Sequence, residues 1–319
     1  MGHYSSIEMT ATAITSMATL PDLPRDVLLV LTRCLVGCDL LRLAGSCAKL
    51  RAALLSHAEI WRWRLPPSLL GADPTASGSQ LRTLYMRQRS LRFRGTAKDA
   101  SNANDRLSCV KVRSIVLDWG EMVAFDLWFS LLPGDARTFD GGVLLGAQSV
   151  AFESSWQPHY RQQFVMVDAH RNLQCSMIEP NAVVAQTLET RRWYHLALMF
   201  NGRDQRVFLD GRLVSERQGV IHHEAYSLRE VQLGSGCIST GSPCRPTEMC
   251  GGWYGFNGLV DAFRVWPTTL SSAAVARLAR GEEIDEQPKS RLAGVRRGDL
   301  HGGATFVKCS RPMERVCEL

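Results

Sequence analysis

The hydrophobic period of the sequence changes near residue 110, and this change constrains the possible folds more than any other feature. Between residues 20 and 65, apolar side chains recur at spacings of three and four residues, the period of an amphipathic helix. In VAFDLWFSL (residues 123–131) the period is two, and Val123 and Phe125 alternate with Ala124. The sequence therefore predicts a helical domain followed by a β domain.

Three helices are predicted between residues 20 and 65. The first follows Pro24, because proline suits the first turn of a helix. The second starts near Asp39, an N-cap residue type, and places Leu40 and Leu54 on one side. The third is short and contains Trp61. A core of roughly forty-five residues is marginal by itself, so we expect the remaining apolar surface to be buried against a partner.

The β part shows short alternating segments separated by turn signals. WYHLALMF (193–200), RVFLD (206–210) and RLVSE (212–216) are separated by Asn-Gly and Asp-Gly, which indicates a three-stranded antiparallel meander. VQLGS and FNGLVDAFRVW supply two further strands, and residues 123–131 read as a half-buried strand. A short helix is predicted over residues 270–281, capped by Ser271 or Ser272. Many short strands in one domain indicate a β-sandwich or jelly roll.

These patterns predict five consecutive regions. The predicted regions are a disordered N-terminus (1–19), a helical module (20–65), a linker with a helix (66–108), an antiparallel β-sandwich (109–282) and a mostly irregular tail (283–319). The linker helix is assigned to QLRTLYMRQRSLRFR, with Leu81, Tyr85 and Leu91 on one side, and the polar loop KDASNAND is taken as the domain boundary.

The charge pattern bears on partners and location. Residues 1–100 contain thirteen Lys and Arg against seven Asp and Glu, so 13 − 7 = +6 accounts for the whole net charge of the chain. These arginines are not interleaved with exposed aromatic residues, which favours a solvated face over binding to nucleic acid. No apolar run approaches the ~20 residues of a membrane span, and no secretory h-region or N-x-[ST] sequon is present. We therefore expect a cytoplasmic or nuclear protein; Gly2 fits a myristoylation pattern, but an unmodified N-terminus is favoured.

Residues suited to metal binding or catalysis are few. The spacing of Cys237, Cys244 and Cys250 lacks a C-x-x-C step, which favours unpaired thiols over zinc. His222 and His223 are followed by Glu224, which could suggest a metal site or acid–base chemistry. The sequence offers no further residue to complete such a site, so a solvated loop is the favoured interpretation. His195 lies on an alternating strand beside Trp193 and is interpreted as structural. Five other cysteines are expected to fill core space: Cys34, Cys38, Cys47, Cys109 and Cys175.

The helical module resembles an F-box over its whole length, Leu23 to Leu65. The residues that carry the resemblance are the opening Leu23-Pro24, the central D-L-L-R-L step, Cys47 and the closing Trp61; Leu50 departs from the aromatic residue often found there. The resemblance implies docking onto the Skp-type adaptor of a cullin-RING ligase. The adaptor-binding residues that it implies are Leu23, Pro24, Val27, Leu28, Leu31, Leu40, Leu43 and Trp61. A generic three-helix domain with the same spacing is the alternative.

The β part resembles a laminin-G or concanavalin-like jelly roll. The residues that carry this resemblance are the W-x-x-[LV]-A step at 193–197, the FNG and FLDGRLV turns, and the closing GFNGLVDAFRVWPTTLSSAAVARL. Some family members bind calcium and sugars at rim loops, which makes Asp and Asn residues possible oxygen ligands, although no D-x-[DN]-x-[DN] cluster is present and no metal is predicted. The residues considered are Asp118, Asp140, Asp168 and Asn172; Asp261 is interpreted as a structural acceptor.

Together the resemblances imply a substrate-recognition subunit of a Skp-cullin-F-box type E3 ubiquitin ligase. The chain would be a non-catalytic adaptor without a cofactor, and the sandwich would bind an unknown protein substrate, glycosylated or not. Which residues bind the substrate stays open. The alternative is a lectin-like or peptide-binding module without a ligase role. A hydrolase needs two facing carboxylates about 5–10 Å apart, and no strand shows an inward-facing E-x-[DE] pair.

Overall fold

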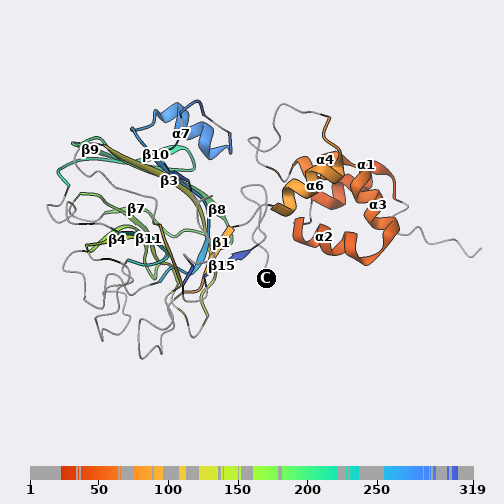
Figure 1. Ribbon diagram of the computed structural model, residues 1–319, viewed down its shortest axis with the longest axis horizontal. Coiled ribbons are helices and arrows are strands. Elements are labelled where there is room, and N and C mark those ends of the chain that lie inside the picture. The colour runs from red at the N-terminus through yellow and green to blue at the C-terminus, as the bar shows by residue number, and fades with distance from the viewer. Residues whose placement is uncertain are drawn as a thin grey trace, which may run out of the picture.

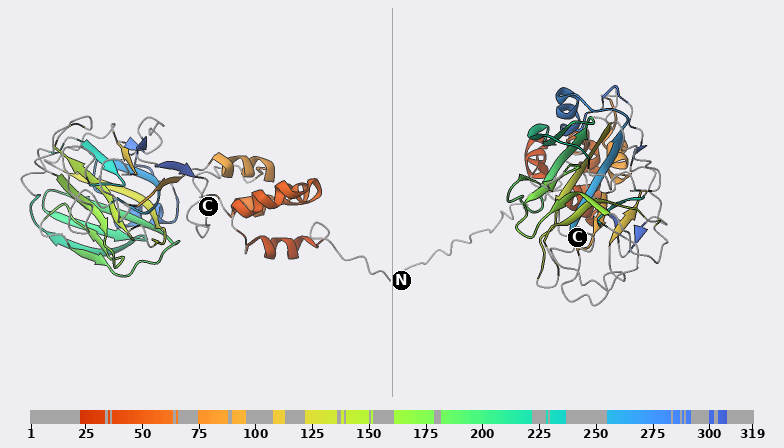
Figure 2. Two further views of the ribbon diagram at one scale, coloured as in Figure 1. Left: turned by 90° about the horizontal axis from the view of Figure 1, so that it is seen from below. Right: turned by 90° about the vertical axis from the view of Figure 1, so that its left-hand side faces the viewer.

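The computed structural model contains a helical unit and a β-sandwich (Figure 1). It describes residues 23–33, 35, 37–63, 65, 75–87, 90–95, 108–112, 122–135, 138, 140–149, 151, 161–178, 182–221, 228, 230–236, 255–282, 284–286, 288, 290–291, 300–301 and 304–307. The predicted disordered N-terminus, with Gly2, lies outside these residues. Figure 2 shows that the helical unit lies to one side of the sandwich. None of the helices in these ranges has the length and apolarity needed to cross a membrane.

The helical unit encloses a hydrophobic core of its own. Its described helices are α1 (Arg25–Arg33), α2 (Gly37–Ser46), α3 (Ala48–Ser56), α4 (Ala58–Arg62) and α6 (Gly78–Arg87). The predicted linker helix, α6, packs against this core, because Leu81 and Tyr85 are buried and the Tyr85 ring lies 5.7 Å from that of Trp61. The unit therefore extends beyond the predicted module, to Arg87.

The second predicted helix is two helices that meet at Cys47. Helix α2 begins at Gly37, so Asp39 lies inside its first turn and does not cap it. Cys47 is extended (φ −155°, ψ 156°), and its sulfur accepts a hydrogen bond from the Leu50 N–H at 3.3 Å. This residue caps α3 and is exposed, contrary to the expected core position, whereas Cys109 and Cys175 are buried as predicted.

The sandwich consists of two antiparallel sheets, which confirms the predicted fold class of this part. The first sheet has the order β10-β9-β8-β3-β12-β1-β15, with β13 paired to β12, and the second has the order β14-β2-β11-β4-β5-β6-β7. The strands of the first sheet are β1 (Ser90–Phe93), β3 (Val123–Leu131), β8 (Trp193–Phe200), β9 (Asp204–Leu209), β10 (Arg212–Gln218), β12 (Gly258–Trp266), β13 (Ser290–Arg291) and β15 (Thr305–Val307). Those of the second are β2 (Cys109–Lys111), β4 (Gly142–Gln148), β5 (Arg161–Val167), β6 (Leu173–Cys175), β7 (Val183–Ala185), β11 (Glu230–Leu233) and β14 (Leu300–His301).

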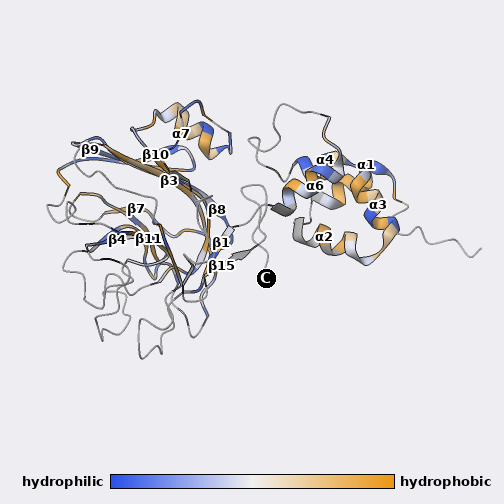
Figure 3. Cartoon of the chain, viewed as in Figure 1, coloured by the Kyte–Doolittle hydropathy of each residue, from blue (hydrophilic) through white to orange (hydrophobic). Residues whose placement is uncertain are grey.

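The predicted meander is present as β8, β9 and β10 in consecutive antiparallel pairs. At the turn between β9 and β10, Asp210 and Gly211 have φ angles of 50° and 79°. Positive φ at two consecutive residues suits a tight hairpin turn, and Asp-Gly tolerates it. The main hydrophobic core lies between the sheets, whose strands carry hydrophobic stretches that are orange in Figure 3.

Strand β3 is buried on both faces, whereas the sequence predicts a half-buried strand. Its odd-numbered residues face the core between the sheets. On the outer face, Ala124 lies in a second cluster with residues of helix α7 (Ser272–Ala279), which packs on β8 and β10. The alternating pattern is real, but the outer face is buried too: α7 covers it at Ala124, and Trp128 packs there with Trp193 and Leu259.

The boundaries of the sandwich also differ from the predicted ones. Leu91 is not helical: it lies in β1, which pairs with β12 and β15. The predicted boundary loop, residues 98–105, falls outside the described residues, but the sheet already includes Ser90 before it. The tail contributes the short strands β13, β14 and β15 and is not simply irregular. Such short strands carry too little pattern to be recognised from sequence.

Candidate functional site

The structure divides the residues expected to bind an adaptor into two groups. Leu28 is buried at 3% exposure, and Leu40 and Trp61 are fully buried in the helical core. The Trp61 indole N–H donates to the Leu54 carbonyl at 3.1 Å, and Leu43 packs partly buried against the same core. As the unit stands, Leu28, Leu40 and Trp61 stabilise it and are not available for contact with a partner, which corrects the expectation for them.

The other group lies on α1 and is exposed. Val27 is 44% and Leu31 is 41% exposed, Pro24 is exposed and Leu23 is half-buried. Val30, which is not among the expected adaptor-binding residues, is 59% exposed on the same helix. The three-residue spacing between Val27 and Val30 could have indicated that both lie on one face of the helix, since residues three apart on a helix are neighbours. We call Pro24, Val27, Val30 and Leu31 the α1 face.

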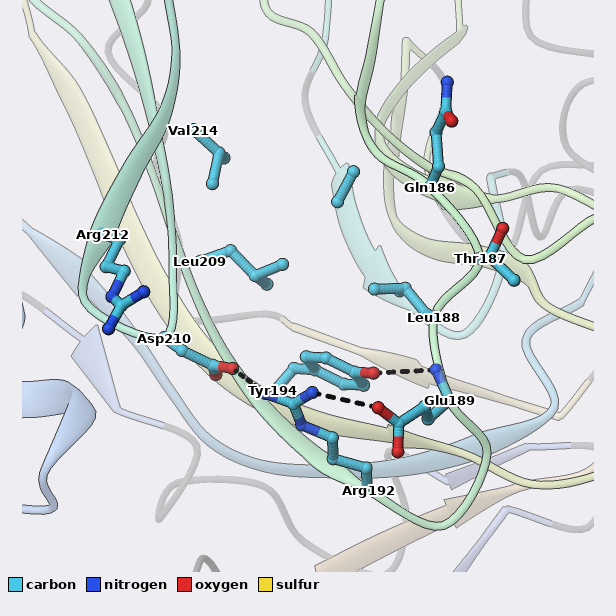
Figure 4. A pocket seen from close by; sticks show the side chains of 11 residues that line it. Gln186, Thr187, Leu188, Glu189, Arg192, Tyr194, Leu209, Asp210, Arg212 and Val214 are labelled. Atoms are coloured by element: carbon cyan, nitrogen blue, oxygen red, sulfur yellow. Dashed lines mark hydrogen bonds and ion pairs between the residues drawn. The ribbon is translucent and has the colours of Figure 1, made fainter.

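A pocket of about 540 Å³ lies where the two sheets end at β7 and β10 (Figure 4). Leu209, Arg212 and Val214 form one wall, and the segment after β7 forms the opposite wall. The residues that line it are Ala185, Gln186, Thr187, Leu188, Glu189, Arg192, Tyr194, Leu209, Asp210, Arg212 and Val214. None of these residues was assigned to substrate binding from sequence, because the loop and the hairpin that form the walls meet only in the fold.

Charged side chains in the pocket are largely paired with one another. The Arg192 guanidinium lies 2.9 Å from Asp210 Oδ2 and 3.3 Å from Glu189 Oε1, and its central carbon lies 4.6 Å from the centre of the Tyr194 ring. The Tyr194 hydroxyl accepts a hydrogen bond from the Glu189 N–H at 2.8 Å. Arg212 differs, because no carboxylate among the described residues pairs with it.

Backbone strain is concentrated around this pocket. Thr187, Arg191 and Asp210 have φ angles of 51°, 61° and 50°. A non-glycine residue at such angles costs free energy and persists only where surrounding contacts hold it. Those contacts are present: the Arg191 N–H donates to Leu131 O at 2.7 Å, and Asp210 Oδ1 accepts from the His195 N–H at 2.9 Å. The rim of the pocket is therefore held in place by hydrogen bonds.

A buried charge cluster lies on the outer face of the first sheet. Asp126 accepts hydrogen bonds from the Trp266 indole N–H at 2.7 Å and from Arg264 Nε at 3.0 Å, and a further one from Arg264 Nη2. His195 Nε2 lies 3.0 Å from Asp126 Oδ2, and because a carboxylate only accepts, this nitrogen carries a proton. Burial raises the pKa of Asp126, but the charge of Arg264 and the hydrogen bond from His195 outweigh it and lower this pKa to about 2. The arrangement matches the structural role predicted for His195.

The considered oxygen ligands of calcium have protein partners in the structure. Asp168 Oδ1 accepts from the N–H groups of His170 and Asn172, and Asn172 Nδ2 donates to Asp168 Oδ2 at 3.0 Å. Asp140 accepts from the Gly134 N–H at 2.6 Å, and Asp261 from the Ala262 N–H at 2.7 Å. Throughout the described ranges, no group of three or more His, Cys, Asp or Glu side chains is arranged to hold a metal ion.

Several sequence candidates fall on residues that the structure does not describe. They are Asp118, His222, His223, Glu224, Cys237, Cys244 and Cys250. The side chain of Cys38 and all of Cys34 also lie outside the described part.

Comparison with protein families supports the fold of the β part. Residues 123–276 match the model of the concanavalin A-like lectin/glucanases superfamily, laminin G type. The C-terminal part of the chain is thus a laminin-G/concanavalin-like jelly roll. No F-box family model matches, although helices are present in the N-terminal part. A search of curated proteins gives no significant match.

Solved structures match parts of this chain at low identity and with TM-scores below 0.5. A Trypanosoma rangeli sialidase in complex with the inhibitor DANA is 14% identical, over 50% of this chain and 23% of the sialidase, with a TM-score of 0.36. A SAP-like pentraxin from Limulus polyphemus is 13% identical, over 69% of this chain and 95% of the pentraxin, with a TM-score of 0.42. Domain 4 of a Geobacillus stearothermophilus arabinanase in complex with arabinotriose is 16% identical, over 51% of this chain and 68% of the arabinanase domain, with a TM-score of 0.33. These values imply no shared ligand or activity.

Proposed function

We propose that this chain is the non-catalytic substrate-recognition subunit of a Skp-cullin-F-box type ubiquitin ligase. In this proposal the helical unit docks onto the Skp-type adaptor, and the sandwich binds the protein that is to be ubiquitinated. The observation that carries the proposal is the α1 face, an exposed apolar surface on a helix whose opposite side is anchored in a core. It adds to the F-box resemblance of residues 23–65.

The α1 face suits helix-to-helix docking. Val27, Val30 and Leu31 share one side of α1, while Leu28 and Thr32 are buried on the other. Exposed apolar side chains gain free energy on burial, about 25 cal/mol for each Å² removed from water. A helical groove on a partner buries such a face through side chains spaced three and four residues apart. A folded core behind the face keeps its side chains in position before docking.

Ubiquitin transfer would then rest on proximity. The conjugating enzyme and RING subunit perform the chemistry, and this chain raises the effective concentration of acceptor lysines near them. The buried carboxylate of Asp126 is enclosed by Arg264, His195 and Trp266, and we assign this cluster to stability.

The test is retention of the Skp-type adaptor by the full chain in a pull-down. The double variant Val30→Asp/Leu31→Asp places two charges on the α1 face without altering a core position, and we expect retention to fall roughly a hundredfold. Val220→Asp, at an 80% exposed position on the sandwich, is the matched control and should retain the adaptor. Equal retention by both variants, or no retention by the unchanged chain, would refute the proposal.

A lectin-like module is the second candidate, favoured by the match of residues 123–276 to a family that includes lectins. A glycan array probed with the full chain distinguishes the candidates. Glycan binding that a chelator abolishes, together with no adaptor retention, would favour the lectin. The two functions are compatible, since a sugar-binding sandwich could itself recognise a substrate.

A further inference from the structure

Two edge strands meet beside the pocket. β7 ends the second sheet and β10 ends the first, and the two strands contact each other on one side of the sandwich. Val183 on β7, Leu213 and Val214 on β10, and Val220 after β10 are all exposed. Outside α1, the only other large hydrophobic residue that is exposed within the described ranges is Met122. Exposed apolar side chains of the sandwich are therefore concentrated along this edge.

The pocket opens at the end of this edge and offers both apolar and charged surface. Leu188 on one wall faces Leu209 and Val214 on the other (Figure 4). Its floor contains the Tyr194 ring, which is only 3% exposed and is covered by Arg192. A volume of about 540 Å³ accommodates one or two side chains of a ligand but not a folded domain.

Arg212 gives the pocket an open position for an anionic group. Arg192 forms ion pairs with both Glu189 and Asp210. Arg212 is exposed on the same wall as Val214 and pairs with no carboxylate in the described part of the chain. A guanidinium binds carboxylates through charge-assisted hydrogen bonds. The formal charges of the four charged lining residues cancel, and Arg212 is the cation among them that is open to an anionic group.

The strained rim adds preorganisation. Thr187 and Asp210, on opposite walls, both have positive φ and are held by hydrogen bonds. A site that is fixed before binding loses less conformational entropy when a ligand enters. Backbone strain at Thr187 is typical of a surface that must keep its shape, whereas the Asp-Gly turn of the other wall tolerates its positive φ.

We propose that the pocket and the adjoining edge at β10 bind an extended acidic segment of the substrate protein. An Asp or Glu side chain of the segment pairs with Arg212, and a neighbouring apolar side chain packs against Leu188, Leu209 and Val214. This inference rests on the proposed function, because it specifies how the sandwich would recognise a target. A peptide fits better than a glycan, because the one aromatic ring among the described lining residues, Tyr194, is buried, and Arg192 pairs with both carboxylates of that lining.

A peptide array probed with the full chain tests this directly. The array carries short linear peptides of random sequence, and the expected result is enrichment of peptides in which Asp or Glu is flanked by Val, Leu or Ile. Arg212→Glu should weaken binding of these peptides roughly tenfold or more and shift the preference toward Lys and Arg. Arg203→Glu makes the same charge change at an exposed position outside the pocket and should leave the preference unaltered.

The outcomes separate this inference from the proposed function. No acidic enrichment, or equal enrichment with Arg212→Glu, overturns the acidic-segment site. Binding to a glycan array that Arg212→Glu abolishes, without peptide enrichment, also overturns it. Adaptor retention depends on the α1 face and not on Arg212, so loss of acidic enrichment with retained adaptor leaves the ligase proposal standing. Acidic enrichment without adaptor retention leaves the acidic-segment site standing and refutes the ligase proposal.

Discussion

At the scale of single residues, Asp126 shows how the sandwich tolerates a charge in its interior. Its carboxylate is fully buried, which by itself disfavours the charged form, but Arg264, His195 and Trp266 supply hydrogen bonds and compensating charge. The sequence predicted structural roles for His195 and Asp261, yet gave no sign that Asp126, Arg264 and His195 meet. They lie on three different strands that the fold brings together, so their contact depends on sheet order.

The lowered pKa of Asp126 makes the stability of the sandwich depend on pH. The carboxyl has a pKa near its ordinary 3.8 when unfolded and about 2 when folded, so the unfolded state binds the proton more readily. The contribution of Asp126, about 2 kcal/mol, is complete above pH ~4 and is lost as the pH falls towards 2. Urea unfolding at pH 7 and at pH 3 measures this change, and the free energy of unfolding should be lower at pH 3.

Asp126→Asn tests whether the carboxylate causes this dependence. The variant leaves the partly buried Arg264 without its counter-charge, so we expect a loss of about 3 kcal/mol at pH 7 and a smaller loss at pH 3. Asp285→Asn, at an exposed position, should stay within about 0.5 kcal/mol of the unchanged chain at both values. If the two variants lose equal stability, the account of the cluster is wrong.

At the scale of elements, period and turn chemistry predicted the strands well. The meander β8–β10, strand β12 and helix α7 all occur where the sequence placed them. The sequence did not reveal that α7 packs on the outer face of the first sheet, or that Cys47 divides a helix, because these outcomes depend on tertiary packing and on a single cap. Likewise β7 and β10 meet beside the pocket only because they are the edge strands of the two sheets and these edges lie on the same side of the sandwich.

Helix α7 provides a prediction at this scale. The sequence left Ser271 and Ser272 as alternative caps, and the structure selects Ser271, whose hydroxyl accepts from the Ala274 N–H at 3.1 Å. Ser271→Ala should therefore reduce the free energy of unfolding by about 1 kcal/mol. Ser272→Ala should change it by less than about 0.5 kcal/mol. Chemical denaturation measures the free energy of unfolding of the two variants. A larger loss for Ser272→Ala than for Ser271→Ala would contradict this assignment.

At the scale of the whole molecule, the helical unit and the sandwich have separate hydrophobic cores. The core around Leu40 and Trp61 shares no residue with the core around Phe125 and Val260. Sequence predicted this division but placed the boundary too late, because β1 and α6 are each too short to show which core they join. Independent cores allow each part to unfold by itself.

Leu40→Ala and Val260→Ala form a matched pair for testing this independence. Each removes a fully buried side chain, and each should destabilise its own unit by about 3 kcal/mol. We expect two transitions in urea, with Leu40→Ala lowering one midpoint and Val260→Ala the other. Tryptophan fluorescence follows both, since Trp61 lies in the first core and Trp128 and Trp266 lie in the sandwich. A single transition that both variants shift equally would contradict separate units.

The central claim is that the α1 face docks onto a Skp-type adaptor while the sandwich remains free for a substrate. Hydrogen–deuterium exchange of the full chain, with and without the purified adaptor, tests it most directly. We expect the adaptor to slow amide exchange in α1 and to leave exchange in β10 and α7 unchanged. Unchanged exchange in α1, or protection confined to the sandwich, would contradict it.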